Sequence, residues 1–426
     1  MANTKAYSYT FCYYVSGHGY GHATRVCQII SQLLSSSRNH RVYIVSHAPR
    51  FIFESTIQIA PTRCVYRNAL IDSTVSQPLP YVVDRQKTIQ DLQSLIESRE
   101  GIVESEAAWL KSVGAQCVLV DAPFIPCAAA STLNIPTCII SNFTFDMVYE
   151  WLREGDELDQ TIEELVRIAV EDYKKANVLF RLPGHIPIPS FDGNWRYIKN
   201  GSNRTNLIVD VPLVVRKAVT PRHEVLRGLG IPDNLIHTKK VLLVSFGGQH
   251  MGKEALKDSL PDGWIGVVCG LKLPPNSLPA NFYDAGMGAF VPDLTNAADA
   301  VLGKLGYGTC SECIAHKKPF LYVSRPQFIE EPGLLKMMKK HGRCLEMPRE
   351  KFESGQWQEY IESSQEQTSA PIPLADNGDQ ITAHSLVSYL DLISMNVIET
   401  KTFEGKEMTS TKIAKVSDPI ALSLTF

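Results

Sequence analysis

Short, almost entirely apolar runs alternate with helix-like segments along this chain, in two successive series. The first series has apolar runs at residues 9–15, 41–46, 117–121 and 137–141. Runs of this kind are typical of parallel strands, which are buried on both faces and therefore lack apolar–polar alternation. Helical patterns fill the intervals, at residues 23–34, 84–113, 126–133 and 156–175. The alternation predicts a doubly wound α/β sheet.

A second series of the same kind follows an irregular stretch. Residues 183–211, rich in Pro, Gly, Asn and Ser, predict a loop that leads to a linker. The later apolar runs are 239–248, 264–270, 300–304 and 320–324, with helices expected near 311–316, 332–341 and 380–393. Because 426 residues exceed what one core usually supports, we predict two Rossmann-like domains, 1–212 and 213–395. Two such sheets imply a cleft between them. Residues 396–426 are expected to be a polar tail, or a segment that packs back on the first domain.

Charge and cysteine content exclude several classes of protein. The net charge is -3 and no long basic block occurs, which argues against a nucleic-acid partner. The ten cysteines include one Cys-x-x-Cys pair, Cys310 and Cys313, with no second pair to complete a zinc site. The N-terminus lacks the profile of a signal peptide, and no apolar run is long enough to span a bilayer. We therefore expect a cytoplasmic protein with reduced thiols, no bound metal and no membrane partner.

A glycine-rich turn with two histidines follows the first apolar run, in the stretch CYYVSGHGYGHATR at residues 12–25. A turn between a strand and a helix presents backbone N–H groups and a helix dipole to an anion or a partly negative group. The glycines are spaced G-x-G-x-G, not G-x-G-x-x-G, and no acid ends the second run, so a dinucleotide site is disfavoured. No Lys-Ser/Thr follows them, so this is no P-loop. The candidates in this turn are His18, Gly19, Gly21 and His22.

His22 and Asp121 form a candidate catalytic pair. The positive helix end and an apolar site both oppose protonation of His22, so it needs a nearby carboxylate if it is to act as a base. Asp121 ends the apolar run 117–121, and the carboxyl ends of parallel strands meet at one edge of a sheet. Two simpler readings stay open: Asp121 as a turn former before Pro123, and His18 as a turn histidine bonded to backbone.

A second group of candidates lies in LGKLGYGTCSECIAHKKP, residues 302–319. The order strand, lysine, glycine loop, threonine and helix suits phosphate oxygens, with positive charge from Lys304 and a hydroxyl from Thr309. Glu312 could accept hydrogen bonds from ribose hydroxyls, or serve only as a favourable partner of the helix dipole. SFGGQ, at 245–249, repeats the phosphate-cradle arrangement at another strand end. These candidates are Gly247, Gly248, Gln249, Lys304, Gly308, Thr309 and Glu312.

Polar and aromatic residues follow the run at 137–141, near the expected cleft. Asn142 and Asp146 are candidate contacts of an acceptor, that is, of a substrate whose hydroxyl group reacts in the cleft. The aromatic residues between and after them fit either an acceptor pocket or core packing.

The order of GHGYGHATR, VLVD, FGGQ and GKLGYGTCSE resembles nucleotide-sugar glycosyltransferases of the GT-B type, in the MurG-like and plant UDP-glycosyltransferase superfamily. Residues from about 11 to 392 also resemble the amino-terminal domain of plant-type L-arabinokinases, through DVPLVVR, DGWIGVVCG, PDLTNAADAVLGKLGYGTCSE and FIEEP. The sugar-kinase activity of those proteins belongs to a separate carboxy-terminal GHMP-kinase domain. No kinase phosphate loop occurs in this sequence, so the resemblance does not imply sugar phosphorylation.

The resemblance implies a role for each matching position. The first domain would face the acceptor, with His22 as catalytic base and Asp121 as its supporting acid. The second domain would hold the donor. Lys304 and Thr309 would contact the diphosphate, with Gly247 and Gly248 near it, and Glu312 would contact the ribose. Phe290 and Val291 would surround the uracil, and Glu330 and Glu331 would contact the sugar hydroxyls. The family usually has Gln at the second of these last two positions, so the donor sugar stays open.

These arguments predict an inverting, metal-independent glycosyltransferase that moves a sugar from a UDP-sugar to a hydroxyl of a small molecule or a protein. The UDP-sugar is a co-substrate, and no bound cofactor is expected. Two alternatives stay open. One is a non-catalytic nucleotide-sugar-binding or regulatory module, and the other is a UDP-sugar epimerase that uses Glu330 and Glu331.

Overall fold

The computed structural model describes residues 7–17, 20–77, 82–192, 207–246, 253–270, 278–286, 288–366 and 371–403. The chain divides into two units, Met1–His384 and Ser385–Phe426. Both β-sheets lie in the first unit. The second unit begins within the last helix, and residues 404–426 lie outside the described residues. The predicted tail at 396–426 is therefore described only as far as residue 403, where the helix ends, and its packing stays a prediction.

The first sheet has seven parallel strands in the order β3-β2-β1-β4-β5-β6-β7. Its strands are β1 (Thr10–Val15), β2 (Arg41–Ser46), β3 (Cys64–Asn68), β4 (Cys117–Asp121), β5 (Thr137–Ser141), β6 (Val178–Arg181) and β7 (Leu207–Asp210). The four apolar runs expected to be strands are confirmed. Three strands were not expected, the edge strands β3 and β7 and the buried β6, because the apolar run of each is only three residues long. The loop predicted at 183–211 was therefore wrong at its end, where β7 lies.

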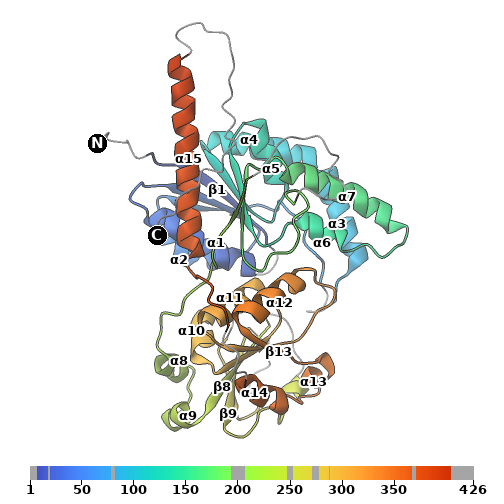
Figure 1. Cartoon of the computed structure of the whole chain (residues 1–426), viewed down its shortest axis with the longest axis vertical. Helices are drawn as coiled ribbons and strands as arrows, with labels where there is room; N and C mark the ends of the chain where they lie inside the picture. The colour runs from blue at the N-terminus through green and yellow to red at the C-terminus, as the bar shows by residue number, and fades with distance from the viewer. Residues whose placement is uncertain are drawn as a thin grey trace. The chain divides into compact units, whose positions relative to one another are not determined.

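Helices connect the strands of the first sheet. They are α1 (Tyr20–Ser35), η1 (Arg50–Phe53), α2 (Glu54–Ile57), α3 (Arg85–Glu97), α4 (Arg99–Ser112), α5 (Ile125–Thr132), α6 (Phe145–Glu150) and α7 (Leu158–Tyr173). Figure 1 shows α4, α5 and α7 on one side of this sheet and α1 and α2 on the other. The single helix predicted over 84–113 is two helices that meet at Ser98. Arg99, the first residue of α4, donates to both carboxylate oxygens of Asp172 on α7, at 2.7 and 2.5 Å, which ties the start of α4 to α7.

The second sheet has six parallel strands in the order β10-β9-β8-β11-β12-β13. Its strands are β8 (Lys240–Ser245), β9 (Trp264–Cys269), β10 (Phe282–Asp284), β11 (Ala300–Gly303), β12 (Pro319–Tyr322) and β13 (Arg343–Glu346). The helices that follow β7 are α8 (Arg222–Gly228), α9 (Asp233–Thr238), η2 (Lys253–Leu256), α10 (Val291–Ala297), α11 (Tyr307–Ala315), α12 (Glu330–His341), α13 (Arg349–Glu353), α14 (Gln358–Gln365) and α15 (Gly378–Phe403). The prediction of two doubly wound α/β sheets is confirmed. The domain boundary at residue 212 stays a prediction.

Both sheets change direction at one strand pair, which is where open α/β sheets bind ligands. In the first sheet this pair is β1 and β4, and Val15 lies opposite Asp121 at their carboxyl ends. In the second sheet the pair is β8 and β11, where Ser245 lies opposite Gly303. The strand order alone therefore directs attention to the loops after β1, β4, β8 and β11.

A close backbone approach joins α12 to the loop after β6, within the first unit. A β-carbon on Gly333 would lie 2.5 Å from the carbonyl oxygen of Gly184 and 2.7 Å from that of His185. Nearby, the backbone N–H of Val83 donates to Oε1 of Gln327 at 2.9 Å. Only glycine fits at position 333, so this contact fixes how a helix of the second sheet meets a loop of the first.

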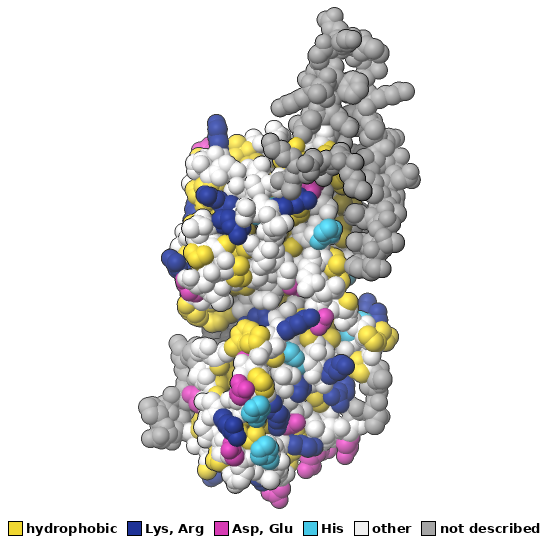
Figure 2. All heavy atoms as spheres, turned by 90° about the vertical axis from the view of Figure 1, so that its left-hand side faces the viewer, with side chains coloured by type: hydrophobic (Ala, Val, Ile, Leu, Met, Phe, Trp, Pro, Cys, Tyr) yellow, Lys and Arg dark blue, Asp and Glu magenta, His cyan; other side chains and the backbone are white. Residues whose placement is uncertain are grey.

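The ten cysteines are free thiols; nine are buried and Cys344 is half-buried. Among the residues that the structure describes, no cluster of three or more His, Cys, Asp or Glu side chains is arranged to hold a metal ion. Within the same residues, no helix is both long enough and apolar enough to cross a bilayer. On the face shown in Figure 2, Lys and Arg side chains lie among Asp, Glu and His side chains and do not form one block.

Candidate active site

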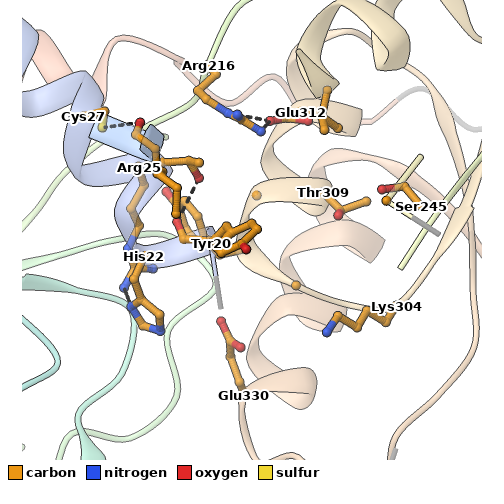
Figure 3. A pocket seen from close by; sticks show the side chains of 18 of the residues that line it. Tyr20, His22, Arg25, Cys27, Arg216, Ser245, Lys304, Thr309, Glu312 and Glu330 are labelled. Carbon is orange, nitrogen blue, oxygen red and sulfur yellow. Dashed lines mark hydrogen bonds and ion pairs between the residues drawn. The ribbon is translucent and has the colours of Figure 1, made fainter. Parts of the chain in front are cut away.

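A cavity of about 910 Å³ lies at the carboxyl ends of both sheets. The first sheet contributes His22 and Arg25 from α1, and the second contributes Ser245, Lys304 and Thr309 (Figure 3). Nine of the predicted site residues line this cavity: Gly21, His22, Phe290, Val291, Lys304, Gly308, Thr309, Glu312 and Glu330. Residues from distant parts of the sequence therefore meet around one space large enough for a nucleotide sugar.

His22 contacts Asp121 behind the cavity wall. Nδ1 of His22 lies 3.1 Å from Oδ1 of Asp121, and the carboxylate is fully buried. The ring of Phe143 packs edge-on against the imidazole, with 5.3 Å between ring centroids. The predicted contact between the first-turn histidine and the acid at the end of β4 is thus present. Asp121 itself does not line the cavity; its carboxylate contacts His22, which does.

Arg25 is the main residue of this cluster that the sequence reasoning missed. Its Nε donates to Oδ2 of Asp121 at 2.8 Å and its Nη2 to Oδ1 at 2.5 Å. Burial alone would raise the pKa of the Asp121 carboxyl, but the charges of Arg25 and His22 and their hydrogen bonds hold that pKa well below its usual range. Arg25 stands three positions after His22, on the same side of a helix. That spacing was the available signal.

The residue after Asp121 adopts a strained backbone conformation. Ala122 is fully buried and has a φ of 78°, in the left-handed region. A residue with a β-carbon enters that region at a cost of about 1–2 kcal/mol. The hydroxyl of Tyr173 donates to the Ala122 carbonyl and fixes this turn.

A second buried carboxylate, Asp72, lies near His22 and was not predicted. Its Oδ2 is buried and has no hydrogen-bond partner. Burial raises the pKa of Asp72 to about 6, against the hydrogen bond of Ser16 and the charges of His22 and His47, which lower it. The loop that carries Asp72 has no recognisable motif, so only the tertiary structure could reveal this group.

We expect Asp72→Asn to stabilise the protein at pH 8 and not at pH 4. The folded-state pKa is raised above the unfolded value of 3.8, so this group favours folding below about pH 4, and that contribution is lost as the pH rises through about 6. A shift of two pKa units corresponds to about 3 kcal/mol. Urea unfolding of the parent and of Asp72→Asn at both pH values measures the difference.

Asp262→Asn is the matched control for that experiment, because Asp262 is exposed. It should leave the pH dependence of the unfolding free energy unchanged. Equal stabilisation by Asp72→Asn at pH 4 and pH 8 would contradict the assignment of a buried, destabilised charge.

On the side of the cavity formed by the second sheet, Lys304 follows β11 and is largely buried. Burial, together with the charge of Arg325, lowers the pKa of the Lys304 ammonium to about 7, although Glu330 and Glu331 act to raise it. Thr309 lies in the first turn of α11, which begins at Tyr307. The Lys304 side chain and a helix N-terminus both line the cavity, and the charged form of Lys304 together with the helix N-terminus would favour an anionic group there.

Glu312 lines the cavity but is already engaged. Only 1% of the residue is exposed, and its Oε1 accepts from Nε and Nη2 of Arg216 at 3.0 and 2.7 Å. Burial raises the pKa of Glu312, although the charge of Arg216 lowers it. The guanidinium of Arg216 also lies 5.6 Å from the centroid of the Phe290 ring. Arg216 comes from an irregular segment after β7, so the sequence offered no local signal for this pair.

Four predicted site residues do not line the cavity: Asp121, described above, and Glu331, Asp146 and Asn142. Glu331 accepts from the backbone N–H and Nε of Arg325 at 2.7 and 2.6 Å, which engages both of its carboxylate oxygens outside the cavity lining. Asp146 is fully buried and accepts from the backbone of Met147 and Ser190, so it caps its own helix and a neighbouring loop. Asn142 is also fully buried, and its Nδ2 donates to Oε1 of Glu330 at 3.0 Å. Neither Asp146 nor Asn142 lines the cavity, and their contact with an acceptor stays a prediction.

Five further predicted positions lie outside the described residues: His18, Gly19, Gly247, Gly248 and Gln249. Their roles stay predictions. The neighbouring residues Gly21 and Ser245, at the described ends of the same two loops, do line the cavity.

Solved structures with the same arrangement of sheets define the class of fold. The chain has the GT-B fold, with two parallel α/β sheets and a site at their carboxyl ends. It is similar to CalG4, the calicheamicin glycosyltransferase (TM-score 0.53, 16% identity, 94% of this chain and 100% of that chain). It is also similar to a UDP-glucosyltransferase from Polygonum tinctorium (TM-score 0.56, 13% identity, 91% and 100%). A third similar structure is UGT89C1 from Arabidopsis thaliana complexed with UDP-L-rhamnose (TM-score 0.53, 13% identity, 89% and 93%).

The sequence itself is similar to a particular protein, L-arabinokinase from Arabidopsis thaliana. The two are 36% identical over 385 residues, which cover 88% of this chain and 34% of the relative. The chain thus spans about a third of the length of the curated relative that it matches. No protein-family model matches the chain.

Proposed function

We propose that this chain is an inverting glycosyltransferase that moves a sugar from a UDP-sugar to an acceptor hydroxyl. One observation carries the proposal: His22, paired with the buried Asp121, lines the same cavity as Lys304 and Thr309. A general base and an anion site thus face one space. The GT-B fold and the solved complex of a similar fold with UDP-L-rhamnose support a UDP-sugar as donor.

In the proposed reaction, Nε2 of His22 takes the proton of the acceptor hydroxyl while that oxygen attacks C1 of the sugar. The bond from C1 to the diphosphate breaks on the opposite face, and UDP leaves with the bonding electron pair. Lys304 and the N-terminus of α11 stabilise the charge that develops on the diphosphate. Asp121 and Asp72 stabilise the imidazolium. In this scheme Glu330, whose Oε1 is held by Asn142, contacts the sugar hydroxyls.

The walls near α1 and α6 suit an acceptor with an apolar body. Nine apolar side chains line this part of the cavity beside polar ones such as Gln28, Ser31 and Ser55: Phe51, Ile52, Ile59, Val75, Val83, Phe143, Phe145, Val148 and Leu152. A hydroxyl on a small, largely apolar molecule would therefore be desolvated next to His22, where general-base catalysis is most effective.

A thermal-shift panel of nucleotides and nucleotide sugars tests the donor class. A ligand that binds only the folded protein raises its apparent stability by RT ln(1+[L]/Kd), about 2.7 kcal/mol at 100 times Kd. We expect UDP and UDP-sugars to raise the melting temperature and AMP or NAD to leave it unchanged. No selective stabilisation by uridine compounds would contradict the proposal.

A non-catalytic nucleotide-sugar-binding module is the second candidate, because Arg216 already engages the carboxylate of Glu312. It predicts stabilisation by UDP-sugars without transfer in any acceptor screen. An epimerase is less well supported, because Glu330 lines the cavity and Glu331 does not. Product analysis with a UDP-sugar and no acceptor would reveal an epimerised sugar.

We expect UDP binding to weaken as the pH rises above about 7. Free Lys304 loses its proton near that pH, and a bound diphosphate favours the charged form, so binding takes up a proton. Above pH 7 the affinity should fall by up to about tenfold per pH unit. Titration calorimetry at pH 6.5, 7.5 and 8.5 measures the affinity and, in buffers of different ionisation enthalpy, the proton uptake.

Lys304→Arg is the control for the pH experiment, because a guanidinium stays charged over this range. Its UDP affinity should be independent of pH between 6.5 and 8.5. The same pH dependence in the parent and in Lys304→Arg would contradict the role of Lys304.

A further inference from the structure

The guanidinium of Arg25 lies beside His22, and its N–H groups can be matched one by one with their acceptors. A guanidinium has five N–H groups: one on Nε and two each on Nη1 and Nη2. Nε donates to Oδ2 of Asp121, and Nη1 donates to Oδ1 of Asn142. Nη2 donates to Oδ1 of Asp121 at 2.5 Å and to Oγ of Ser141 at 2.9 Å. Both hydrogens of Nη2 are therefore used.

This count decides which nitrogen of His22 carries the proton. Nη2 of Arg25 lies 3.1 Å from Nδ1 of His22, but it has no hydrogen left to donate there. Oδ1 of Asp121, also 3.1 Å from Nδ1, can only accept. Nδ1 must then carry the hydrogen and donate it to Asp121, which leaves Nε2 with the lone pair that a general base needs.

We propose that Arg25 and Ser141 are positioning residues that set the tautomer of His22. Ser141 occupies the second Nη2 hydrogen of Arg25 and so prevents the guanidinium from donating to Nδ1. Its own hydroxyl donates to Oδ1 of Asp121 at 3.1 Å, so this oxygen has donors from both Ser141 and Arg25 beside the imidazole. The catalytic consequence rests on the proposed function, whereas the tautomer does not depend on it.

Arg25 also connects the base to the donor side of the cavity. The Asn142 side chain that accepts from Arg25 donates to Oε1 of Glu330 at 3.0 Å. The guanidinium lies 5.0 Å from the centroid of the Tyr307 ring, in the first turn of α11. Arg25 is fixed from both sheets, so the orientation of the base is tied to the residues expected to surround the donor.

The experiment compares Ser141→Ala and Arg25→Met with the parent. Ser141→Ala keeps the charge of Arg25 but frees one Nη2 hydrogen, which can then donate to Nδ1 and move the imidazole proton to Nε2. Two-bond ¹⁵N–¹H NMR spectra at pH 8, with the His22 signals assigned by loss in His22→Gln, report the tautomer without substrate. We expect the Nδ1–H form in the parent and a clear population of the Nε2–H form in Ser141→Ala.

Turnover provides the second measurement. We expect kcat of Ser141→Ala to fall at least about tenfold, toward the roughly 10²–10⁴-fold contribution of a general base, while KM for the UDP-sugar stays within twofold. Ser131→Ala and Arg167→Met, at exposed positions of α5 and α7, are matched controls that should change neither tautomer nor turnover. If Arg25→Met fails to fold because Asp121 loses its partner, Ser141→Ala still decides the question.

Two results would overturn this inference: an Nε2–H imidazole in the parent, or an unchanged tautomer in Ser141→Ala. Both are read from the free protein. Failure to find sugar transfer by the parent would instead count against the proposed function, so the two failures can be told apart.

Discussion

Replacement of His22 by alanine is expected to slow sugar transfer by about 10²–10⁴-fold, the usual contribution of a positioned general base. The imidazole is the candidate base that lines the cavity, and Asp121 behind it is fully buried and does not reach the acceptor directly. UDP affinity should be unchanged, because the proposed diphosphate contacts come from Lys304 and α11. Steady-state kinetics with the donor identified by thermal shift measure kcat, and calorimetry measures UDP binding.

His223→Ala is the matched control, because His223 lies exposed on α8. It should retain parental turnover and UDP affinity. Sugar transfer by His22→Ala at the parental rate would show that His22 is not the base, whether or not UDP binding changes.

The second large effect is expected from Gly333→Ala. The added β-carbon would lie 2.5 Å from a backbone oxygen of Gly184 and 2.7 Å from that of His185, and backbone atoms cannot move aside as a flexible side chain can. Overpacking of this kind typically costs about 1–3 kcal/mol. Because this contact joins α12 to the loop after β6, the substitution should also displace Glu330, at the start of α12, from Asn142. Denaturant unfolding and kcat/KM for the donor should both decrease.

Gly101→Ala is the contrasting control. Gly101 lies in α4, and a β-carbon there would meet no atom within 4 Å. Alanine in a helix interior is favoured over glycine by about 0.5–1 kcal/mol, so this variant should be more stable than the parent. Gly333→Ala with parental stability and turnover would show that the two backbones can separate without consequence.

The pattern of apolar residues predicted most of the buried strands correctly. The runs that became β2, β4 and β5 were predicted with their observed bounds, because a strand buried on both faces must be apolar along its length. Strands β3, β6 and β7 were missed because the apolar run of each is only three residues long, too short to stand out as a strand. The single helix predicted over 84–113 was wrong because its break at Ser98 accompanies an ion pair with α7, 73 residues away from Arg99.

Some residues of the candidate site could likewise be predicted from the sequence, and others could not. His22 and Asp121 could be paired from sequence, because each follows or ends a strand and the carboxyl ends of parallel strands meet at one edge. Glu330 and Glu331 are adjacent in sequence and looked equivalent. Only the structure shows that Arg325 binds the carboxylate of Glu331 while Glu330 lines the cavity.

The spacing of apolar runs was enough to predict two doubly wound sheets with a histidine and an acid at one sheet edge, and the resemblance of the glycine-turn motifs to UDP-glycosyltransferases implied the GT-B type. The tertiary structure alone decided which charges meet, such as Arg25 with Asp121 and Arg216 with Glu312, each pair 96 residues apart. Strands and helices could be predicted because their formation depends on the spacing of apolar side chains along the chain. The partner of a buried charge depends instead on which distant segments pack together, and nothing in its neighbouring residues records that.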